Sequence, residues 1–299
     1  MKKKVFLFGL LFSLLLLCGC GVNLTSTVKL NKDFSGTRVM SCTFSSRDFH
    51  SYFKGSKEDL NKLIKESCPD ALTYTSSSSD GNDTYTFYLR FSSLDDYKKK
   101  VRDLLNFSPK ITYEYGDSPF VSGLIYKENF TSKDLMTWLY TALYEGKYID
   151  KDSSSDLWDL KSTKISFLGT TYETKDKINI DQMAYVPLSS IHIDTKTKKS
   201  GKLARVIEFD LPQQTLDQNA GKIRSYFAEN DITWENTSDG KTLCISFDAN
   251  NFSDLAQKTR TVLHSKNSFG TYSSTCSKDN PFTLKINYEE SLDLSHFIQ

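Results

Sequence analysis

The cysteines are the residues of this 299-residue chain whose chemistry depends most on where the protein resides. Cys18 and Cys20 follow an uncharged apolar run from Val5 to Leu17, which itself follows the three lysines Lys2–Lys4. A cationic start, about 7–15 apolar residues and a small residue before the cleavage point are typical of a secretory signal peptide. A membrane-spanning helix needs roughly 20 apolar residues, so this shorter run predicts export followed by cleavage.

Four cysteines remain after the leader: Cys42, Cys68, Cys244 and Cys276. Exported proteins meet oxidising surroundings, where an even number of cysteines is typical of disulfides, and four cysteines allow three pairings. An internal repeat, described below, favours Cys42–Cys68 and Cys244–Cys276, because each bond then lies within one half of the chain. Closing loops of about 26–32 residues would stabilise the fold by roughly 3–4 kcal/mol for each bond.

Other reactive side chains do not form a catalytic pattern in the sequence. No histidine stands near another histidine or a cysteine at the spacing of metal ligands, so no metal site is predicted. A Gly-x-Ser-x-Gly elbow and a glycine-rich phosphate loop are absent from the sequence. Acidic pairs such as Asp95-Asp96 lie near a helix start, where carboxylates are favoured electrostatically. We therefore predict no catalytic residue and no cofactor. The alternative is a cell-wall or glycan hydrolase whose residues meet only in space.

Two groups of residues could form a binding surface. Lys98-Lys99-Lys100 lies on the polar side of an expected helix, where it is either a solvated face or a contact for anionic lipid headgroups. Four tyrosines could line a glycan- or lipid-binding face, or could pack in the core: Tyr113, Tyr115, Tyr126 and Tyr140. Both alternatives stay open for each group.

Charge argues against one class of partner. Removing the three leader lysines leaves 35 of the 38 basic residues against 37 acidic ones, a net side-chain charge of −2. A nucleic-acid-binding domain is expected to carry a basic patch or stripe, so we predict no nucleic-acid partner.

The elements that must position these residues occur twice in the same order. Each copy opens with a hairpin, formed by strands at 25–30 and 37–44 in the first and at 190–195 and 202–211 in the second. A helix follows in each copy. The first begins at a Ser56–Asp59 capping box and is ended by Pro69, and the second carries Ala220, Ile223 and Phe227 on one face.

Hairpins with Asp-Gly corners come next, at Asp80-Gly81 and at Asp239-Gly240. The second helix of each copy has the same apolar spacing, offset by 158 positions from Leu94 to Phe252. Each copy then reaches a Pro-Phe pair and a strand, at 121–126 and at 283–288. Matching hairpins and helices in one order are not expected by chance, so the sequence indicates an internal repeat.

We therefore predict an α+β fold of two related ββαββαβ units, with mostly antiparallel sheets and helices packed on one face. The first copy continues into a helix that begins at a Thr131–Asp134 capping box, and into an added hairpin at 163–168 and 170–173. The expected divisions are a signal peptide at 1–19, a first unit at 20–185 and a second, shorter unit at 186–299.

Leu17-Cys18-Gly19-Cys20 resembles the lipobox of bacterial lipoproteins. The resemblance implies that the Cys20 thiol carries a diacylglyceryl group, which holds the mature protein at the outer face of the bacterial cytoplasmic membrane. The segment from Val28 to Val39 is similar to LppM-type lipoprotein domains, and the whole chain looks like surface lipoproteins of low-GC Gram-positive bacteria. The resemblance to LppM-type domains implies an α+β envelope domain with a lipid- or glycolipid-facing role and no catalysis. We therefore expect a non-enzymatic, lipid-anchored envelope protein that binds a membrane-proximal ligand or protein partner, with a lipid, a glycan or an envelope protein as the partner.

Overall fold

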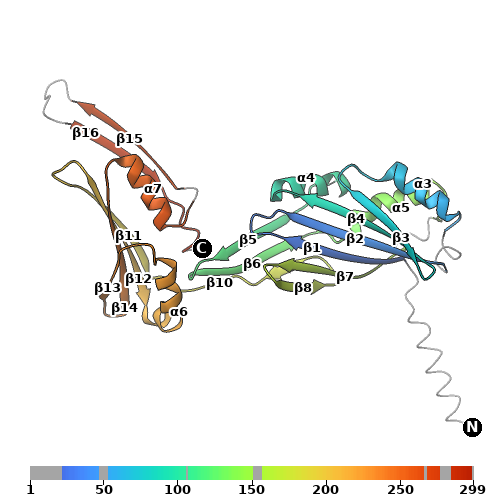
Figure 1. The fold of residues 1–299 in the computed structure, drawn as a ribbon, viewed down its shortest axis with the longest axis horizontal. Helices are drawn as coiled ribbons and strands as arrows, with labels where there is room; N and C mark the ends of the chain where they lie inside the picture. The colour runs from blue at the N-terminus through green and yellow to red at the C-terminus, as the bar shows by residue number, and fades with distance from the viewer. Residues whose placement is uncertain are drawn as a thin grey trace, which may run out of the picture. The chain divides into compact units, whose positions relative to one another are not determined.

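The computed structural model describes residues 22–46, 53–105, 107–150, 157–265, 268–276 and 284–297, with residues 274–276 and 284–286 described by their backbone alone. Contacts divide the described residues into two compact units (Figure 1). Unit 1 comprises the described residues up to 114 together with 125–181, and unit 2 comprises 115–124 together with those from 182 onward. The expected signal peptide at 1–19 lies outside the described residues.

Unit 1 is built on a six-stranded sheet in the order β3-β4-β2-β1-β7-β8 (Figure 1). Neighbouring strands run antiparallel, except that β1 and β7 are parallel. The β7–β8 hairpin is the one that the sequence predicts as an addition to the first copy. The strands are β1 (Val22–Leu30), β2 (Gly36–Ser45), β3 (Thr73–Ser79), β4 (Asn82–Phe91), β7 (Trp158–Phe167) and β8 (Thr170–Thr174).

The helices of unit 1 contact the buried face of this sheet. They are α3 (Lys57–Ser67), α4 (Leu94–Leu105), the 3₁₀ turn η1 (Asp134–Met136) and α5 (Thr137–Glu145). Strand β1 alternates between buried and exposed side chains along its length, as expected for a sheet that packs on one side. The other face of the sheet is rich in hydroxyl groups. Ser41 pairs with Thr86 and Thr43 with Thr84 across β2 and β4, each at 3.0 Å between the hydroxyl oxygens.

Both predicted capping boxes of unit 1 are confirmed. Ser56 caps α3, because its side chain accepts a hydrogen bond from the Asp59 amide while the Asp59 carboxylate accepts one from the Ser56 amide. Helix α3 then ends at Ser67, directly before Cys68 and Pro69. At η1 the Thr131 amide donates to the Asp134 carboxylate at 2.7 Å. The Ser56 box fixes where α3 begins. The Thr131 box precedes η1, and α5 itself begins later than predicted, at Thr137, with no side-chain cap at Met136.

A smaller sheet combines β5 (Ile111–Asp117), β6 (Val121–Glu128), β9 (Asn179–Asp181) and β10 (Ala184–Tyr185). The predicted element order was wrong at this point, because it placed no strand between the second helix and the Pro-Phe pair. The structure has β5 there, and β15 (Phe269–Cys276) stands at the corresponding place in unit 2. Alternation of Ile111, Tyr113 and Tyr115 could have predicted β5.

Unit 2 has a four-stranded antiparallel sheet in the order β11-β12-β14-β13. Helix α6 (Gln213–Tyr226) precedes β13, and α7 (Phe252–Val262) follows β14. A two-stranded antiparallel hairpin of β15 and β16 (Leu284–Ser291) completes the unit. The sheet strands are β11 (Ser190–Thr197), β12 (Leu203–Pro212), β13 (Ile232–Asn236) and β14 (Gly240–Ala249).

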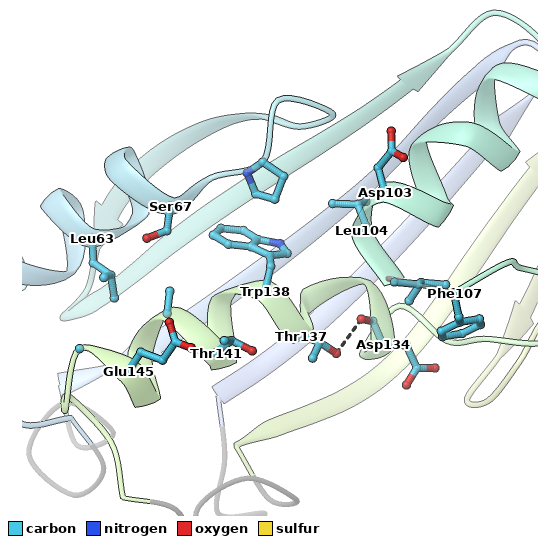
Figure 2. A pocket seen from close by; sticks show the side chains of 14 residues that line it. Leu63, Ser67, Asp103, Leu104, Phe107, Asp134, Thr137, Trp138, Thr141 and Glu145 are labelled. Atoms are coloured by element: carbon cyan, nitrogen blue, oxygen red, sulfur yellow. Dashed lines mark hydrogen bonds between the residues drawn. The ribbon is translucent and has the colours of Figure 1, made fainter.

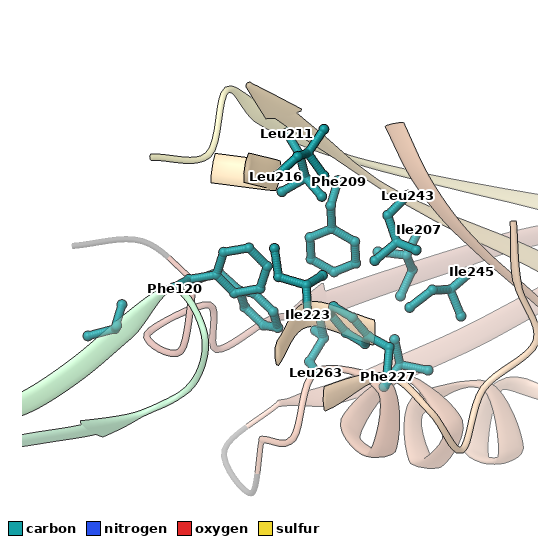
Figure 3. Packing of buried hydrophobic residues seen from close by; sticks show 13 residues of the cluster. Phe120, Ile207, Phe209, Leu211, Leu216, Ile223, Phe227, Leu243, Ile245 and Leu263 are labelled. Carbon is teal, nitrogen blue, oxygen red and sulfur yellow. The ribbon is translucent and has the colours of Figure 1, made fainter. Parts of the chain in front are cut away.

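Buried aromatic rings form the centre of unit 2 (Figure 3). The ring of Phe209 on β12 lies 5.1 Å from that of Phe227, at the end of α6, and 5.1 Å from that of Phe297. Phe120, from the 115–124 segment, lies 5.4 Å from Phe297. Burying each such side chain stabilises the fold by about 1.5–3 kcal/mol. The predicted fold class, α+β with mostly antiparallel sheets, is confirmed by the strand pairing of both units.

Candidate functional site

Unit 1 contains a groove of about 680 Å³ between three helical segments (Figure 2). One wall comes from the end of α3, with Leu63, Ser67 and Pro69. The opposite wall comes from the end of α4 and the residue Phe107 beyond it. Its volume lies within the range of about 300–1,000 Å³ that is usual for ligand sites.

The third side of the groove is one face of α5. Thr137, Trp138, Thr141, Ala142 and Glu145 line it at spacings that repeat every helical turn. The eight steps from Thr137 to Glu145 span about 12 Å at 1.5 Å per residue. The Thr137 hydroxyl donates to the Asp134 carbonyl at 2.7 Å, which ties the first turn of α5 to η1 (Figure 2).

Trp138 stands between the two walls, with Ser67 on one side and Leu104 on the other (Figure 2). Its ring meets Phe87 of β4 edge-on at 5.4 Å between centroids, so the indole is held by the core of the sheet. The indole Nε1 is buried and has no hydrogen-bond partner among the described residues. A buried donor without a partner costs about 1–3 kcal/mol. Because the Nε1 atom itself is closed to solvent, Trp138 contributes to the groove as a lining residue and not through this N–H.

The charged residues that line the groove are all carboxylates. They are Asp103, Asp134 and Glu145. Asp134 is engaged with Thr131, and Asp103 lies 3.4 Å from Lys99 in an exposed pair within α4. Glu145 is exposed and has no ion-pair partner among the described residues. Phe107 exposes 46% of its surface at the same end as Asp103. The groove therefore combines an apolar wall with negative charge.

The lining residues of the groove include no histidine, cysteine or lysine. Its hydroxyl groups are those of Ser67, Thr137 and Thr141, and the Thr137 hydroxyl donates to the Asp134 carbonyl. The lining can offer apolar contact, hydrogen bonds and carboxylates, which is the chemistry of recognition.

The strongest cluster of ionisable groups lies elsewhere in unit 1 and is closed to solvent. Arg38 on β2 is 0% exposed, and its Nη1 donates to Glu128 Oε2 and to the Tyr97 hydroxyl, each at 2.7 Å. Its Nη2 donates to the Ser132 hydroxyl at 2.7 Å. Tyr97 and Tyr126 both donate to Glu128 Oε1. No part of this cluster can reach a substrate, so its role is structural.

Burial sets the protonation of this cluster. It raises the pKa of the Tyr97 hydroxyl well above its usual range, and the same holds for Tyr126. Burial opposes the charge of Arg38, but Glu128, Tyr97 and Tyr126 outweigh it and raise the pKa of the guanidinium. The tyrosines therefore stay neutral donors, and Arg38 stays charged.

Unit 2 holds a similar buried arginine. Arg205 on β12 is 2% exposed, and its Nη1 donates to Glu290 Oε1 on β16 and to the Thr259 hydroxyl on α7, each at 2.7 Å. Its Nε and Nη2 both donate to Thr195 on β11. Arg38 thus joins β2 to β6 in unit 1, and Arg205 joins β12 to β16 in unit 2. In each unit the arginine lies on the second strand of the first hairpin, and its carboxylate partner lies on the last strand of a later hairpin.

Sequence reasoning missed these arginines, although a signal was present. Along β2, Arg38 alternates in phase with the buried Met40, Cys42 and Phe44. Along β12, Arg205 shares the buried phase of Leu203 and Ile207. An arginine at an inward position of a strand needs a buried carboxylate partner, which the pattern could have predicted.

The cysteines lie in different settings. Cys20 falls outside the described residues. Cys42 is fully buried on β2, Cys68 is partly exposed at the end of α3, and Cys244 is buried on β14, each with a free thiol in the structure. Burial raises the pKa of all three thiols. The structure does not join Cys42 to Cys68, and the side chain of Cys276 is not among those described. Cys42–Cys68 and Cys244–Cys276 stay predictions, which non-reducing peptide mapping tests.

Histidines do not gather with other ligands. Within the described residues no group of three or more His, Cys, Asp or Glu side chains could hold a metal ion. His192 lies 3.5 Å from Asp210, His264 Nε2 lies 3.1 Å from the Tyr226 carbonyl, and His50 lies outside the described residues.

The lysines and tyrosines singled out from the sequence are dispersed. Lys99 and Lys100 pair with carboxylates of their own helix, Asp103 and Asp96. Tyr126 is fully buried, which confirms the core alternative for that residue, and Tyr113 packs against the same Phe34 ring. Tyr140 stacks on Tyr144 along α5, and Tyr115 lies in unit 2.

No protein-family model matches this chain, and no similar sequence was found among curated proteins. Within the part of the chain that the structure describes, no helix has the length and apolar character needed to span a membrane. The functional argument therefore depends on the groove and on the residues themselves.

Proposed function

We propose that this protein is a lipid-anchored cell-envelope protein that binds a membrane-proximal ligand or protein partner and does not catalyse a reaction. The observation that carries the binding role is the groove of unit 1, where the exposed Phe107, Trp138 and three carboxylates line one space. The buried Arg38 cluster supports a non-catalytic role, because these hydrogen-bonded ionisable groups of unit 1 lie in its interior, closed to solvent.

The proposed anchor is a diacylglyceryl group on Cys20. Each buried methylene contributes about 0.8 kcal/mol, and two acyl chains together make attachment stable where one chain is marginal. The Cys20→Ala variant should move the protein from the membrane fraction to the medium. A variant that stays with the membrane through detergent-free fractionation would rule out this anchor.

We also propose that the two units are related copies. Two observations support this: the matching strand orders β3-β4-β2-β1 and β13-β14-β12-β11, and the buried pairs Arg38–Glu128 and Arg205–Glu290 at corresponding strands. In this proposal the groove is an addition to one copy, because α5 has no counterpart among the described elements of unit 2.

The binding role is tested by blocking the groove. Thr141 is exposed on the lining face of α5, so Thr141→Arg should fill the groove and reduce retention of the protein's soluble Cys20→Ala form on isolated envelope. Thr112→Arg is the matched control, because Thr112 is an exposed threonine of unit 1 that does not line the groove. Equal retention of both variants, or hydrolysis of wall or glycan that a single Asp or Glu substitution removes, would contradict the proposal.

A further inference from the structure

Resting on the proposed relation between the two units, we propose that β16 pairs antiparallel with β16 of a second copy of this protein. Two β15–β16 hairpins would then join into one four-stranded sheet. The edge concerned is the side of β16 that lies away from β15, where no other strand pairs with it among the described residues. This self-association is separate from the proposed binding role of the groove.

Strand β16 corresponds to β6 of unit 1. Glu128 on β6 and Glu290 on β16 each form an ion pair with the buried arginine of their own unit. A tyrosine stands two positions before each glutamate, Tyr126 in β6 and Tyr288 in β16, and a Pro-Phe pair begins nine positions before each. These matches align β6 with β16 at an offset of 162 positions, from Glu128 to Glu290.

In unit 1 the corresponding edge is covered by another strand. Strand β9 pairs antiparallel with β6, with Ile180 opposite Tyr126. The Glu128 amide donates to the Ile178 carbonyl at 2.9 Å, so backbone hydrogen bonds close this edge of β6. An open strand edge presents unpaired N–H and C=O groups, which are a template for pairing with another chain.

Strand β16 lacks two features that protect many natural edges. It pairs with β15 from Leu284 to Ser291 without a register shift, and it contains no proline. A two-stranded hairpin is also at best marginally stable by itself, whereas sheets of three or more strands are more stable. The hairpin would therefore gain stability from a strand added at the edge of β16.

The sequence of β16 matches that of the strand that covers β6. Residues 177–181, which include β9, read Lys-Ile-Asn-Ile-Asp, and residues 285–289 of β16 read Lys-Ile-Asn-Tyr-Glu. Asn287 and Glu289 are exposed on β16, as the asparagine and aspartate of β9 are. Strand β16 thus combines the open edge that β6 would have without β9 and the sequence of the strand that covers it. A second β16 is therefore the occupant that fits this edge.

The pairing of β9 with β6 also gives the register of the proposed contact. Tyr126 and Ile180 lie opposite each other, and both correspond to Tyr288 of β16. The same register places Tyr288 opposite Tyr288 of the second copy, with a twofold axis between them. Tyr288 lies near the middle of β16, so the two strands overlap along most of their length. Asn287 then lies opposite Glu289 of the second copy, and no two like charges face each other directly.

Cysteine cross-linking of the soluble Cys20→Ala protein tests this register. Protein carrying Asn287→Cys is mixed with protein carrying Glu289→Cys, because these positions lie opposite each other only between two copies. Directly opposite side chains on antiparallel strands are about 4.5–5.5 Å apart at Cβ, while diagonal ones are about 7–8 Å apart. We therefore expect mild oxidation to give more disulfide-linked dimer in the mixture than in either protein alone. Peptide mapping verifies that the two introduced cysteines are the ones linked.

The matched control is a mixture of Thr271→Cys and Ser273→Cys proteins. Thr271 and Ser273 are exposed on β15, opposite Glu289 and Asn287 within the same hairpin, but they do not lie at the proposed edge. This mixture should give no more linked dimer than its separate components.

Charge variants provide a second, independent measurement. Asn287→Glu would place like charges opposite each other on both sides of the twofold axis, and should weaken self-association about twofold to thirtyfold. Asn287→Lys would place opposite charges there and should strengthen it. Ser273→Glu is the matched control and should leave self-association unchanged. Sedimentation equilibrium measures the association, and circular dichroism verifies that each variant is folded.

The proposal is supported if the mixture forms the linked dimer and if association follows the sign of the charge at position 287. It is overturned if the folded mixture cross-links no better than its components, or if the control mixture cross-links equally well. Equal association of Asn287→Glu and Asn287→Lys would also overturn it. Envelope retention of Thr141→Arg tests the binding role separately, so failure of one proposal is distinguishable from failure of the other.

Discussion

Arg38 and Glu128 are 90 residues apart in sequence, yet Arg38 Nη1 and Glu128 Oε2 lie 2.7 Å apart with both side chains buried. The pair joins β2 of the large sheet to β6 of the small one. Two buried charges are costly to desolvate, and this geometry offsets the cost through hydrogen bonds from Tyr97 and Tyr126 to the same carboxylate. Each buried charge is therefore compensated only while the other member of the pair is present.

Removing one member of this pair should destabilise unit 1 strongly. Glu128→Gln leaves the Arg38 charge buried without its counter-charge, and we expect a loss of about 3–5 kcal/mol in the free energy of unfolding. Urea denaturation followed by circular dichroism measures the change.

The double variant Arg38→Met with Glu128→Leu is the informative control. It removes both charges and fills their space with apolar side chains. It should therefore lower the free energy of unfolding less than Glu128→Gln alone, because replacing a whole buried ion pair by apolar residues is often neutral. A Glu128→Gln variant as stable as the parent protein would contradict the assignment of a charged, buried pair.

Gly221 should be replaceable with a gain in stability. It lies inside α6, and a Cβ atom built there meets no atom within 4 Å. Because an interior glycine costs a helix about 0.8–1.0 kcal/mol relative to alanine, Gly221→Ala should raise the free energy of unfolding by up to about 1 kcal/mol. Thermal denaturation of the two proteins compares them.

Gly123→Ala, in contrast to Gly221→Ala, should lower the stability of the protein. Gly123 has φ +118°, and a Cβ atom there would lie 2.0 Å from the Gln182 carbonyl oxygen. We expect a clear loss of stability from this variant. Similar melting temperatures for the two alanine variants would show that local backbone geometry is not the cause.

Leu168 occupies a turn position that suits asparagine better. The β7–β8 hairpin turns through Leu168 and Gly169, with φ values of 47° and 84°, and Leu168 is 54% exposed. A non-glycine residue with positive φ is strained by roughly 1–2 kcal/mol, while Asn-Gly is the favoured pair in such turns. Leu168→Asn should therefore stabilise unit 1 in urea denaturation, and Leu168→Val should destabilise it.

Asp210 should make unit 2 sensitive to acid. The Ser190 hydroxyl and then the Thr242 hydroxyl, at 2.6 Å, donate to its carboxylate and lower its pKa from the usual 3.8. A carboxylate with a lowered folded-state pKa stabilises the fold above its unfolded-state pKa, and that stability is lost as the pH falls through the folded-state pKa. The relevant window therefore lies below about pH 4.

The measurement is urea denaturation at a series of acid pH values. Asp210→Asn should be less stable than the parent protein at neutral pH, and the difference should shrink as the pH falls below this window. Asp231→Asn is the control, because Asp231 is an exposed carboxylate of the same unit. A constant difference between Asp210→Asn and the parent at every pH would contradict a titrating hydrogen-bond acceptor at this site.

Local patterns predicted much of the secondary structure. The Ser56 and Thr131 boxes are read from residues three positions apart, and the structure confirms both. The Asp80-Gly81 corner lies where β3 turns into β4, with positive φ at both residues. Capping boxes and Asp-Gly turns depend on residues that are close in sequence, so a single sequence is sufficient to predict them.

The groove could not be predicted in the same way. Its walls come from α3, α4 and α5, and the contacts that bring these helices together join elements far apart in sequence. The parallel pairing of β1 with β7 likewise joins residues more than one hundred positions apart. Nothing in the local pattern of Trp138 indicates that its N–H lacks a partner, because that depends on every group around it.

The position of β1 has a mechanical consequence. Strand β1 begins at Val22 and pairs with β7 from Val22 to Leu30 and with β2 from Asn23 to Leu30, so it is held on both sides. Backbone hydrogen bonds in sheets cross between strands at a steep angle to them. Tension applied to the chain before Val22 and directed along the strand would therefore load both ladders together in shear, rather than opening one bond after another. The strand that follows the proposed anchor is thus an interior strand of the sheet, which two ladders hold against a pull.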